Sequence, residues 1–444
     1  MQREPYQVVK RVKTAAFIIN LAERLKPALT RLIPIKILRR VKKSIVDSSM
    51  MKLASAGNRN AFTRTAFIDG VNLIGYIRGE IGLGESCRLV ARGLAETGLD
   101  FTIYNYEQVS AMRHSDFSWE YKITNTTPYN INLIHIQPYE LPLAYLRINE
   151  DIWSNRYNIA FWLWELEEFP EQWQNAFSLV DEIWTPSEFA SESIRKATNK
   201  PVYTVPYALQ TPDCGEYGRR DFDLPEDKFL FLCMYDCSSF FERKNPIAAI
   251  NAYKQAFPPD EKNVGIVIKL NNPQKKDMQL IREKLADYSN VYFVAEVLDR
   301  VKANALIACT DAYVSLHRSE GFSLIPAEAM FLGTPVIATN WSANTEFMSE
   351  DTGCLVDYVF INIEKDYGPY LAGNRWAEPV IEQASGYMRK LYEDRDYHQL
   401  IASNARLRIS EKLAPEHMAA LIRKRISAIY SKADAVESKV LQLG

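Results

Sequence analysis

Residues 319–339, SEGFSLIPAEAMFLGTPVIAT, carry the clearest structural pattern in the chain. Polar residues and a glycine give way to an apolar run, and a Gly-Thr-Pro turn then leads into β-branched residues. This order predicts a loop, a helix over 324–331 and a strand over 335–339 in quick succession. Short helix and strand units of this kind are typical of a parallel sheet with helices on both faces.

Two carboxylates frame the predicted helix start, Glu320 and Glu328, with seven residues between them. Gly321 lets the backbone approach a ligand closely. The free N–H groups from Gly321 to Leu324 point out of the helix start, where they favour a phosphate. Carboxylates accept hydrogen bonds from sugar hydroxyls. The stretch therefore predicts a site for a ligand that carries both phosphate and hydroxyl groups.

Strand and helix signals alternate along the chain in two sets. The first set consists of strands at 65–69, 99–104, 132–136, 158–163, 182–185 and 202–205, with helices at 85–97, 171–180 and 189–197. The second consists of strands at 229–235, 265–270, 291–294, 312–316 and 335–339, with helices at 246–257, 276–285, 300–309, 324–331 and 414–430. We therefore expect an α/β protein with two doubly wound sheets. Ligands of such sheets bind at the carboxyl ends of the strands.

The 444 residues are enough for two globular domains, because single cores stop growing near about 250–300 residues. The stretch 211–225, rich in Pro, Gly, Asp and Arg, is interpreted as the linker between them. The predicted divisions are a basic helical extension and linker over 1–64, a first domain over 65–210, a second domain over 211–413, and a last helix and tail over 414–444.

Charge is distributed unevenly: residues 1–64 hold 15 Lys and Arg against 3 Asp and Glu, and the other 380 residues hold 38 against 52. In the extension, apolar residues fall at helical spacing among basic ones, at Val9, Val12, Ala16 and Ile19 and again at Leu38, Val41 and Ile45. Such a helix suits an anionic membrane surface, where each basic residue adds about 1 kcal/mol. The alternative is a solvated helix that packs on the body or on a partner chain. Basic residues without interleaved aromatics, on an acidic body, argue against nucleic acid.

The six cysteines form no C-x-x-C pair, so we expect packed thiols rather than disulfides or zinc. The longest N-terminal apolar run, 14–22, is too short to span a membrane. These features predict a cytoplasmic protein, with the extension as a peripheral contact to the inner face of the cell membrane.

Arg243 and Lys244 come shortly after the strand predicted at 229–235. Two cations at a strand-to-helix turn can hold a diphosphate and neutralise the charge that develops as it leaves. A helix start that only faced solvent would favour acids at this place. The two cations therefore favour a functional interpretation.

Together with these cations, residues 319–339 resemble the Glu-x7-Glu signature of the retaining glycosyltransferases of family 4, the glycosyl transferases group 1. The resemblance covers about residues 66–430 and is sharp only in patches. It implies the GT-B fold, in which two Rossmann-like domains face each other across a cleft and the last helix, here 414–430, crosses back to the first domain. It also implies transfer of a sugar from a nucleotide diphosphate to an acceptor hydroxyl with retained configuration. By match, Glu320 lies by the donor sugar, Glu328 holds the ribose and Lys244 holds the diphosphate. The family arginine often stands where this chain has Ser238, so Arg243 departs from the pattern.

A glycine-rich stretch, 75–84, precedes the helix predicted at 85–97. Its glycine spacing does not fit a dinucleotide fingerprint. It resembles the loop of the N-terminal domain that faces the donor diphosphate in this family. Lys269, at a strand end, is expected to add charge near the diphosphate, and Thr339 to lie near the nucleotide; a plain surface lysine is the alternative for Lys269. The expected donor-binding residues are Gly82, Gly84, Lys269, Gly321, Phe322, Ser323, Leu324, Glu328 and Thr339.

The acceptor is expected at the first domain, near the run FWLWELEEFP at 161–170. Trp162 and Trp164 offer rings that stack on sugars, and Glu165 offers a carboxylate for hydroxyls. The alternative for the tryptophans is packing against the sheet. His135 ends a predicted strand, and in the family a histidine near such a strand end approaches the reacting sugar; a structural histidine is equally compatible. The expected catalytic residues are Glu320, Lys244, Arg243 and His135.

Lysine and arginine can do the charge work of a metal, and no Asp-x-Asp motif ends a strand, so we predict no metal and no cofactor. The resemblance implies that the departing diphosphate oxygen takes the acceptor's proton. The expected reaction transfers a sugar to a glycan or lipid-linked glycan in cell-surface polysaccharide biosynthesis. Two alternatives remain open: a sugar-nucleotide epimerase of the same fold, and an inactive sugar-binding scaffold protein.

Overall fold

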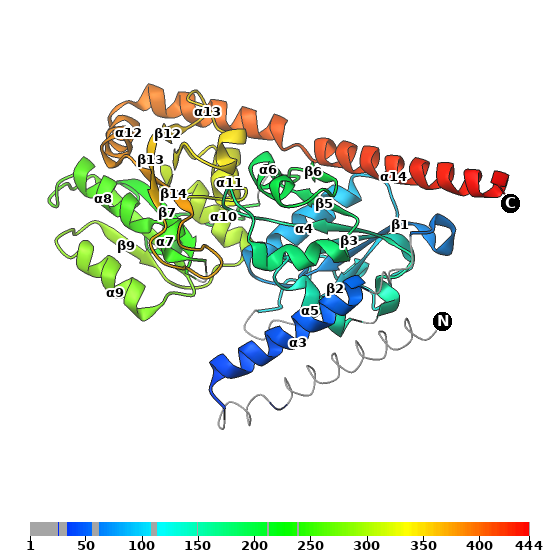
Figure 1. The fold of residues 1–444 in the computed structure, drawn as a ribbon. Helices are drawn as coiled ribbons and strands as arrows, with labels where there is room; N and C mark the ends of the chain where they lie inside the picture. Colours follow the sequence, from blue (N-terminus) through cyan, green and yellow to red (C-terminus); the bar gives the residue numbers. More distant parts are fainter. Residues whose placement is uncertain are drawn as a thin grey trace.

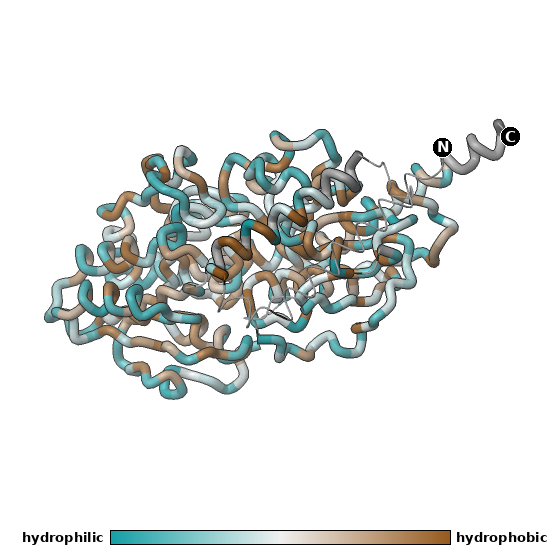
Figure 2. Tube along the Cα trace, turned by 60° about the horizontal axis from the view of Figure 1, so that its bottom comes forward, coloured by the Kyte–Doolittle hydropathy of each residue, from teal (hydrophilic) through white to brown (hydrophobic). Residues whose placement is uncertain are grey.

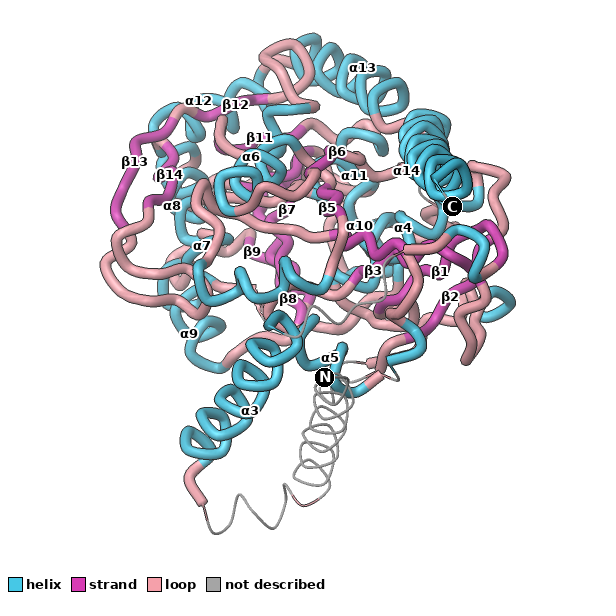
Figure 3. Tube along the Cα trace, turned by 45° about the vertical axis from the view of Figure 1, so that its right-hand side comes forward, coloured by secondary structure: helices cyan, strands magenta, loops and turns pink. Residues whose placement is uncertain are grey.

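The computed structural model describes residues 25, 33–55, 62–107, 113–148, 150–210, 213–237 and 239–443. Within them, the strands form two six-stranded parallel sheets and one antiparallel hairpin. The two sheets lie side by side, and helices surround each of them (Figures 1 and 3). Colours alternate between hydrophilic and hydrophobic along the outer helices in Figure 2, as expected where one helix face packs on a sheet. The predicted α/β class with two doubly wound domains is confirmed.

The first sheet has the strand order β2-β1-β3-β4-β5-β6, so the direction of winding reverses between β1 and β3. Its strands are β1 Ile68–Gly75, β2 Phe101–Asn105, β3 Tyr129–His135, β4 Tyr157–Phe161, β5 Glu182–Thr185 and β6 Val202–Thr204. Its helices are α4 Gly82–Ala95, α5 Leu141–Arg147 and α6 Glu188–Ala197, with 3-10 segments η1 Arg64–Ala66, η2 Glu120–Lys122, η3 Glu150–Ile152 and η4 Glu171–Leu179.

The second sheet has the order β12-β11-β10-β7-β8-β9, and its winding reverses between β7 and β10. Its strands are β7 Phe229–Asp236, β8 Val264–Asn271, β9 Val291–Val294, β10 Ala312–Ser315, β11 Val336–Thr339 and β12 Cys354–Val356. Its helices are α7 Phe241–Lys244, α8 Pro246–Ala256, α9 Lys275–Lys284, α10 Arg300–Ala308, α11 Leu324–Leu332, α12 Ile381–Glu393 and α13 Arg395–Lys412, with η5 Arg219–Phe222 and η6 Ala343–Glu346. The hairpin consists of β13 Tyr358–Asn362 and β14 Arg375–Pro379.

Buried asparagines fix the register of the central strands of the first sheet. Asn72, Asn132 and Asn158 are paired neighbours on β1, β3 and β4. The Asn72 amide donates to Asn132 Oδ1 at 2.9 Å, and the Asn132 amide donates to Asn158 Oδ1 at 2.8 Å. A slip of one residue would leave these buried polar groups unpaired, which is costly.

The last helix, α14 Pro415–Leu443, runs from the second domain back along the first (Figure 1). Its Met418 packs so closely on Gly93 of α4 that a Cβ at Gly93 would lie 2.3 Å from the sulfur. Arg425 contacts Glu182 with two nitrogens, each at 2.7 Å. Tyr430 donates to Asn130 Oδ1 at 2.8 Å. The crossing implied by the resemblance is therefore present, and the helix is longer than the predicted 414–430.

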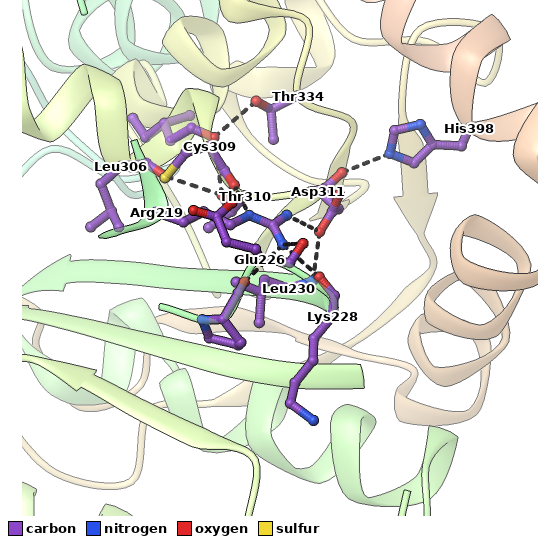
Figure 4. A network of polar contacts seen from close by, with 12 residues as sticks. Arg219, Glu226, Lys228, Leu230, Leu306, Cys309, Thr310, Asp311, Thr334 and His398 are labelled. Atoms are coloured by element: carbon purple, nitrogen blue, oxygen red, sulfur yellow. Dashed lines mark hydrogen bonds and ion pairs between the residues drawn. The ribbon is translucent and has the colours of Figure 1, made fainter. Parts of the chain in front are cut away.

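The segment after the first sheet is held on the second domain by Arg219 (Figure 4). Its guanidinium donates to Cys309 O at 2.8 Å and to Lys228 O at 2.6 Å, and it pairs with Asp311 at 2.7 Å. The Asp311 carbonyl in turn accepts a hydrogen bond from His398 of α13 at 2.8 Å. These bonds fasten the second half of the predicted linker to the sheet.

Several predicted boundaries are wrong. Helix α3, Ile35–Ser55, continues through the first part of the linker expected at 48–64. The first strand begins at Ile68 rather than at residue 65, because residues 64–66 form a 3-10 turn. The predicted helix at 171–180 is a 3-10 segment. The elements α5, β12, β13, β14, α12 and α13 were not predicted from the sequence.

Helix α3 lies against the first domain, where Ile45 and Val46 pack on its core. Ile37 and Val41 of the same helix are 49% and 52% exposed. The predicted stripe from Val9 to Ile19 lies outside the described residues. Among the described helices, none is long and apolar enough to cross a membrane.

Candidate functional site

Two loops meet at the point where the winding of the second sheet reverses. One follows β7 and leads into α7 with Arg243 and Lys244, and the other follows β10 and leads to Glu320. Because β7 and β10 are parallel neighbours, both loops leave the same edge of the sheet. Doubly wound sheets bind their ligands at this reversal point. The fold therefore brings the two strongest sequence motifs together.

Glu320 is the centre of an ion-pair cluster. Its Oε1 pairs with Lys244, and its Oε2 lies 3.1 Å from Nη1 of Arg243. Its backbone N–H donates to Ser342 Oγ at 2.9 Å. Burial alone would raise the pKa of Glu320, but Lys244 and Arg243 hold it at about 2. Glu320 is therefore a carboxylate at any physiological pH, fixed in one orientation.

The two cations of the cluster differ in exposure, and this difference separates their roles. The Arg243 side chain is 5% exposed, whereas that of Lys244 is 21% exposed. Arg243 also donates to Ser319 O at 2.8 Å, and its guanidinium lies 5.6 Å from the ring centre of Tyr370. Arg243 is thus the buried partner that holds Glu320 in place, and Lys244 is the cation that a ligand can reach. Ser238, the alternative position for the family arginine, lies outside the described residues.

The start of α11 has the backbone expected of an anion site. Ser323, which precedes the helix, has a φ of 71° and a ψ of 56°. In the described part of the chain, no acceptor receives the backbone N–H groups of Gly321, Phe322 and Ser323. A Cβ on Gly321 would lie 2.9 Å from Trp164 O, so a glycine is needed here because the first domain approaches the loop closely.

Glu328, one turn further along α11, borders a pocket between the domains. Its side chain is 3% exposed, and its Oε1 pairs with Arg300 of α10. Its Oε2 has no hydrogen-bond partner among the described residues. The pocket, of about 310 Å³, is lined by Leu89, Arg92, Leu209, Gln210, Asp213, Arg300, Val301, Asn304, Glu328 and Phe331. A buried carboxylate oxygen without a partner calls for a hydrogen-bond donor, such as a ligand hydroxyl.

Lys269 and Thr339, expected near the donor, are engaged by the protein. The Lys269 ammonium is buried and donates to Asn271 Oδ1 at 2.7 Å and to Glu296 O at 2.8 Å. Burial lowers its pKa to about 8. Thr339 donates to the carbonyl of His317 at 2.6 Å. Both residues hold loops of the second domain in place, and their contact with the donor stays a prediction.

The glycine-rich loop of the first domain has two glycines expected to bind the donor, Gly82 and Gly84, and internal packing explains the second of them. A Cβ on Gly84 would lie 1.9 Å from Gly79 O, so only glycine lets the start of α4 close on its own loop. A Cβ on Gly82 would meet nothing within 4 Å. Gly82 is therefore the position of the pair where a ligand has room.

His135 is buried in the first domain rather than directed at a cleft. Its Nε2 lies 2.6 Å from Ser86 Oγ, and its ring stacks on Phe161 at 5.5 Å. Burial lowers the pKa of His135 to about 4, so the ring is neutral. Of the two interpretations offered by the sequence, these contacts favour the structural one.

Trp162 and Trp164 belong to the hydrophobic core of the first domain, at 0% and 2% exposure. The indole of Trp162 donates to Ile136 O at 2.9 Å, and that of Trp164 donates to Glu168 O at 2.8 Å. Neither ring offers a free face to a sugar. The predicted stacking role is corrected for both, because their polar edges and their faces are used within the protein.

Glu165 lies at the donor cluster itself. Its Oε1 is 3.9 Å from Nη2 of Arg243, and its Oε2 accepts a hydrogen bond from Tyr370 at 3.2 Å. Its backbone carbonyl accepts from Ser319 Oγ. Its side chain retains 22% exposure. Of the three residues expected at the acceptor, Glu165 is the one that reaches the ion-pair cluster around Glu320.

The segment from β13 to β14 completes the site and was missed from the sequence. Tyr370 stacks on Trp164 at 5.6 Å, and Arg375 contacts Glu167 through two hydrogen bonds of 2.5 and 2.8 Å. We call the stretch 358–379 the clasp, because it joins the second domain to the first. Its alternating aromatic residues, at Tyr358 and Phe360, are a strand signal that was available in the sequence.

No group of His, Cys, Asp or Glu among the described residues is arranged to hold a metal ion. That the reaction needs no metal stays a prediction.

Part of the second domain matches a known protein family. Residues 240–359 match the family described as glycosyl transferases group 1. This range contains Arg243, Lys244, Glu320 and Glu328. No curated protein sequence matches the chain.

Solved structures match along most of the chain. HepE of Anabaena in complex with UDP and glucose has 13% identity and a TM-score of 0.60, covering 81% of this chain and 100% of that one. Sucrose-phosphate synthase of Thermosynechococcus elongatus has 13% identity and a TM-score of 0.59, covering 82% and 100%. A glycosyltransferase of Rickettsia africae has 12% identity and a TM-score of 0.58, covering 82% and 99%. At these identities the likeness is one of fold. Residues 240–359 are thus similar to the glycosyl transferases group 1, and they lie within a two-domain chain that has the GT-B architecture.

Proposed function

We propose that this chain is a retaining glycosyltransferase that moves a sugar from a nucleotide-diphosphate donor to an acceptor hydroxyl. The observation that carries the proposal is the ion pair between Glu320 and Lys244 at the start of α11. It places a fixed carboxylate and an accessible cation beside backbone N–H groups that have no described acceptor. A sugar diphosphate needs this combination, because its hydroxyls donate hydrogen bonds and its phosphates accept them.

In the proposed reaction, Lys244 and the N–H groups of Gly321, Phe322 and Ser323 stabilise the departing diphosphate. Glu320 holds a hydroxyl of the donor sugar, and Glu328 accepts a hydrogen bond from the ribose through its unpaired oxygen. The diphosphate oxygen that leaves takes the proton of the acceptor hydroxyl on the same face of the sugar. Arg243 keeps Glu320 in place, and Glu165 is the group nearest to the incoming acceptor.

A donor screen tests this proposal first. UDP-, GDP-, ADP- and dTDP-sugars are added to the protein, and the melting temperature is followed. UDP-sugars come first because the solved structure of HepE contains UDP and glucose. A specific rise in melting temperature is expected for one base. No shift for any of the four bases would contradict the proposal.

Release of free nucleotide diphosphate separates the alternatives. A transferase releases it in step with added acceptor, whereas an epimerase converts the sugar nucleotide without needing an acceptor. A scaffold protein would bind the sugar nucleotide and release nothing. A glycan or lipid-linked glycan of cell-surface polysaccharide biosynthesis is the proposed acceptor class.

Metal independence is part of the same proposal, because Lys244 supplies positive charge at the diphosphate. Transfer should continue at an unchanged rate in excess EDTA. A loss of activity that Mg²⁺ or Mn²⁺ restores would contradict this part.

We also propose that α3 rests on the inner face of an anionic membrane. Its outward side presents Ile37 and Val41 next to the exposed Arg40. Replacing both apolar residues by serine should weaken sedimentation with vesicles of phosphatidylglycerol and phosphatidylcholine. Leu280→Ser, on α9 of the second domain, is the matched control. Equal sedimentation of all three proteins would contradict the membrane contact.

A further inference from the structure

The nucleoside end of the site contains a cation that the proposed reaction does not use. Arg300, at the first position of α10, pairs with Oε1 of Glu328, and its side chain is 39% exposed. Both residues line the pocket between the domains. A carboxylate that is 3% exposed is costly as an ion unless a cation accompanies it. Arg300 supplies that cation.

Arg300 also stands close to the first domain. Burial alone would raise the pKa of Glu85 on α4. That pKa is lowered instead, because positive charge comes from Arg300, Arg88 and Arg92. Arg88 Nε lies 2.9 Å from one Glu85 oxygen, and Arg92 Nη1 lies 3.6 Å from the other. Arg300 therefore forms an ion pair with the buried carboxylate of Glu328 and adds positive charge near that of Glu85.

We propose that Arg300 is a positioning residue for the donor: it keeps Glu328 ionised and leaves Oε2 to accept a ribose hydroxyl. The inference rests on the proposed function, because the ligand concerned is the nucleotide part of the donor. Arg300 acts through Glu328, so its loss removes the preference for ribose hydroxyls rather than the contact with phosphate.

The physical reason lies in the protonation state of the acceptor. A hydroxyl donates a stronger hydrogen bond to a carboxylate than to a neutral acid. Without Arg300, the buried Glu328 gains a proton more readily. The other charged groups that line the pocket are Arg92 of α4 and Asp213 of the linker, and Glu85 lies beyond them on α4. None of these forms an ion pair with Glu328 among the described residues.

The test compares UDP with 2′,3′-dideoxy-UDP by titration calorimetry on the full chain. We expect the wild type to bind UDP at least about tenfold more tightly, because a hydrogen bond to a charged group is lost with the hydroxyls. In Arg300→Ala the preference should fall below about threefold near neutral pH and recover as the pH rises. Arg300→Lys should restore most of it. Lys302→Ala, a cation on the same helix that lies over Tyr217, is the matched control and should keep the full preference.

A double variant guards against misfolding. Arg300→Ala/Glu328→Gln leaves no unpaired buried charge, so it should fold and still lack the preference at every pH. Full preference for UDP in Arg300→Ala would overturn the inference while leaving the proposed transfer reaction standing. Equal binding of the two nucleotides by the wild type would overturn the inference as well. A wild type that binds none of UDP, GDP, ADP and dTDP would contradict the proposed function and the inference together.

Discussion

In the second domain, Lys244, Arg243 and Glu320 meet in one ion-pair cluster, whereas in the first domain His135, Trp162 and Trp164 lie in the hydrophobic core. The first group sits on loops at the reversal point of a sheet, with charges that need partners or ligands. The second group sits on strands and strand ends that other segments cover. The difference shows that a polar or aromatic residue at a strand end identifies a binding site only when no other segment of the chain covers it.

The largest expected effect comes from the charge at the centre of the cluster. Glu320→Gln keeps the shape of the side chain and removes the charge that Lys244 and Arg243 hold. The rate of sugar transfer should fall by about 10²–10³-fold, as for a lost group that stabilises charge in a transition state. Initial rates at saturating donor measure the effect. Glu242→Gln, on α7 beside the two cations, is the control and should keep the wild-type rate.

The opposite behaviour is expected for Trp162. Trp162→Phe loses the hydrogen bond to Ile136 O and leaves a small cavity, so the free energy of unfolding should fall by about 2 kcal/mol. The rate per folded molecule should not change. Urea unfolding and transfer assays on the same sample measure both. An intact stability with a raised KM for the acceptor would show that Trp162 contacts the acceptor after all.

A smaller effect is expected at the clasp, which joins the two domains. Tyr370→Phe keeps the stacking on Trp164 and removes the hydrogen bond to Glu165. The lost hydrogen bond is worth about 1 kcal/mol, and because it positions Glu165, the transfer rate should fall about fivefold. Tyr367→Phe, which stays stacked near Trp376 on the same segment, serves as the control. An unchanged rate in both variants would mean that Glu165 is positioned without Tyr370.

The last prediction concerns pH and His135. Its folded pKa of about 4 lies below the usual 6.5, so the unfolded chain binds the proton more readily between these values. Stability from this group is complete above pH 6.5 and is lost as the pH falls toward 4. In His135→Gln, the free energy of unfolding should depend less on pH in this window. Equal pH dependence in the two proteins would mean that His135 titrates normally and is open to solvent.

The parts of the fold that were predicted correctly are those with a local signal. The strands β5 and β9 carry apolar runs between clear turns, and they begin and end where the sequence indicated. Glu320 and Lys244 were predicted together because a motif places each at a strand end of a doubly wound sheet. Their ion pair follows from the strand order, which the alternation of elements implies.

The parts that were missed depend on contacts between distant segments. The role of Arg243 changed because Glu320, Ser319 and Tyr370 surround its side chain, and Tyr370 is 127 residues away in the sequence. Gly321 was expected to admit a ligand, and the structure shows that Trp164 of the other domain approaches it. Lys269 was expected to be free at a strand end, but its ammonium donates a hydrogen bond to the carbonyl of Glu296, in the loop after β9. For single residues of this kind, the local sequence does not indicate which distant segment the side chain contacts.

Binding to Lys244→Ala of the nucleoside diphosphate that the donor screen selects tests whether the cluster at the start of α11 holds the donor diphosphate. Titration calorimetry compares this variant with the wild type, and melting curves check that both are folded. We expect the wild type to bind this nucleoside diphosphate and Lys244→Ala to bind it at least about tenfold more weakly with the fold intact. Equal affinity in the two folded proteins would contradict this expectation.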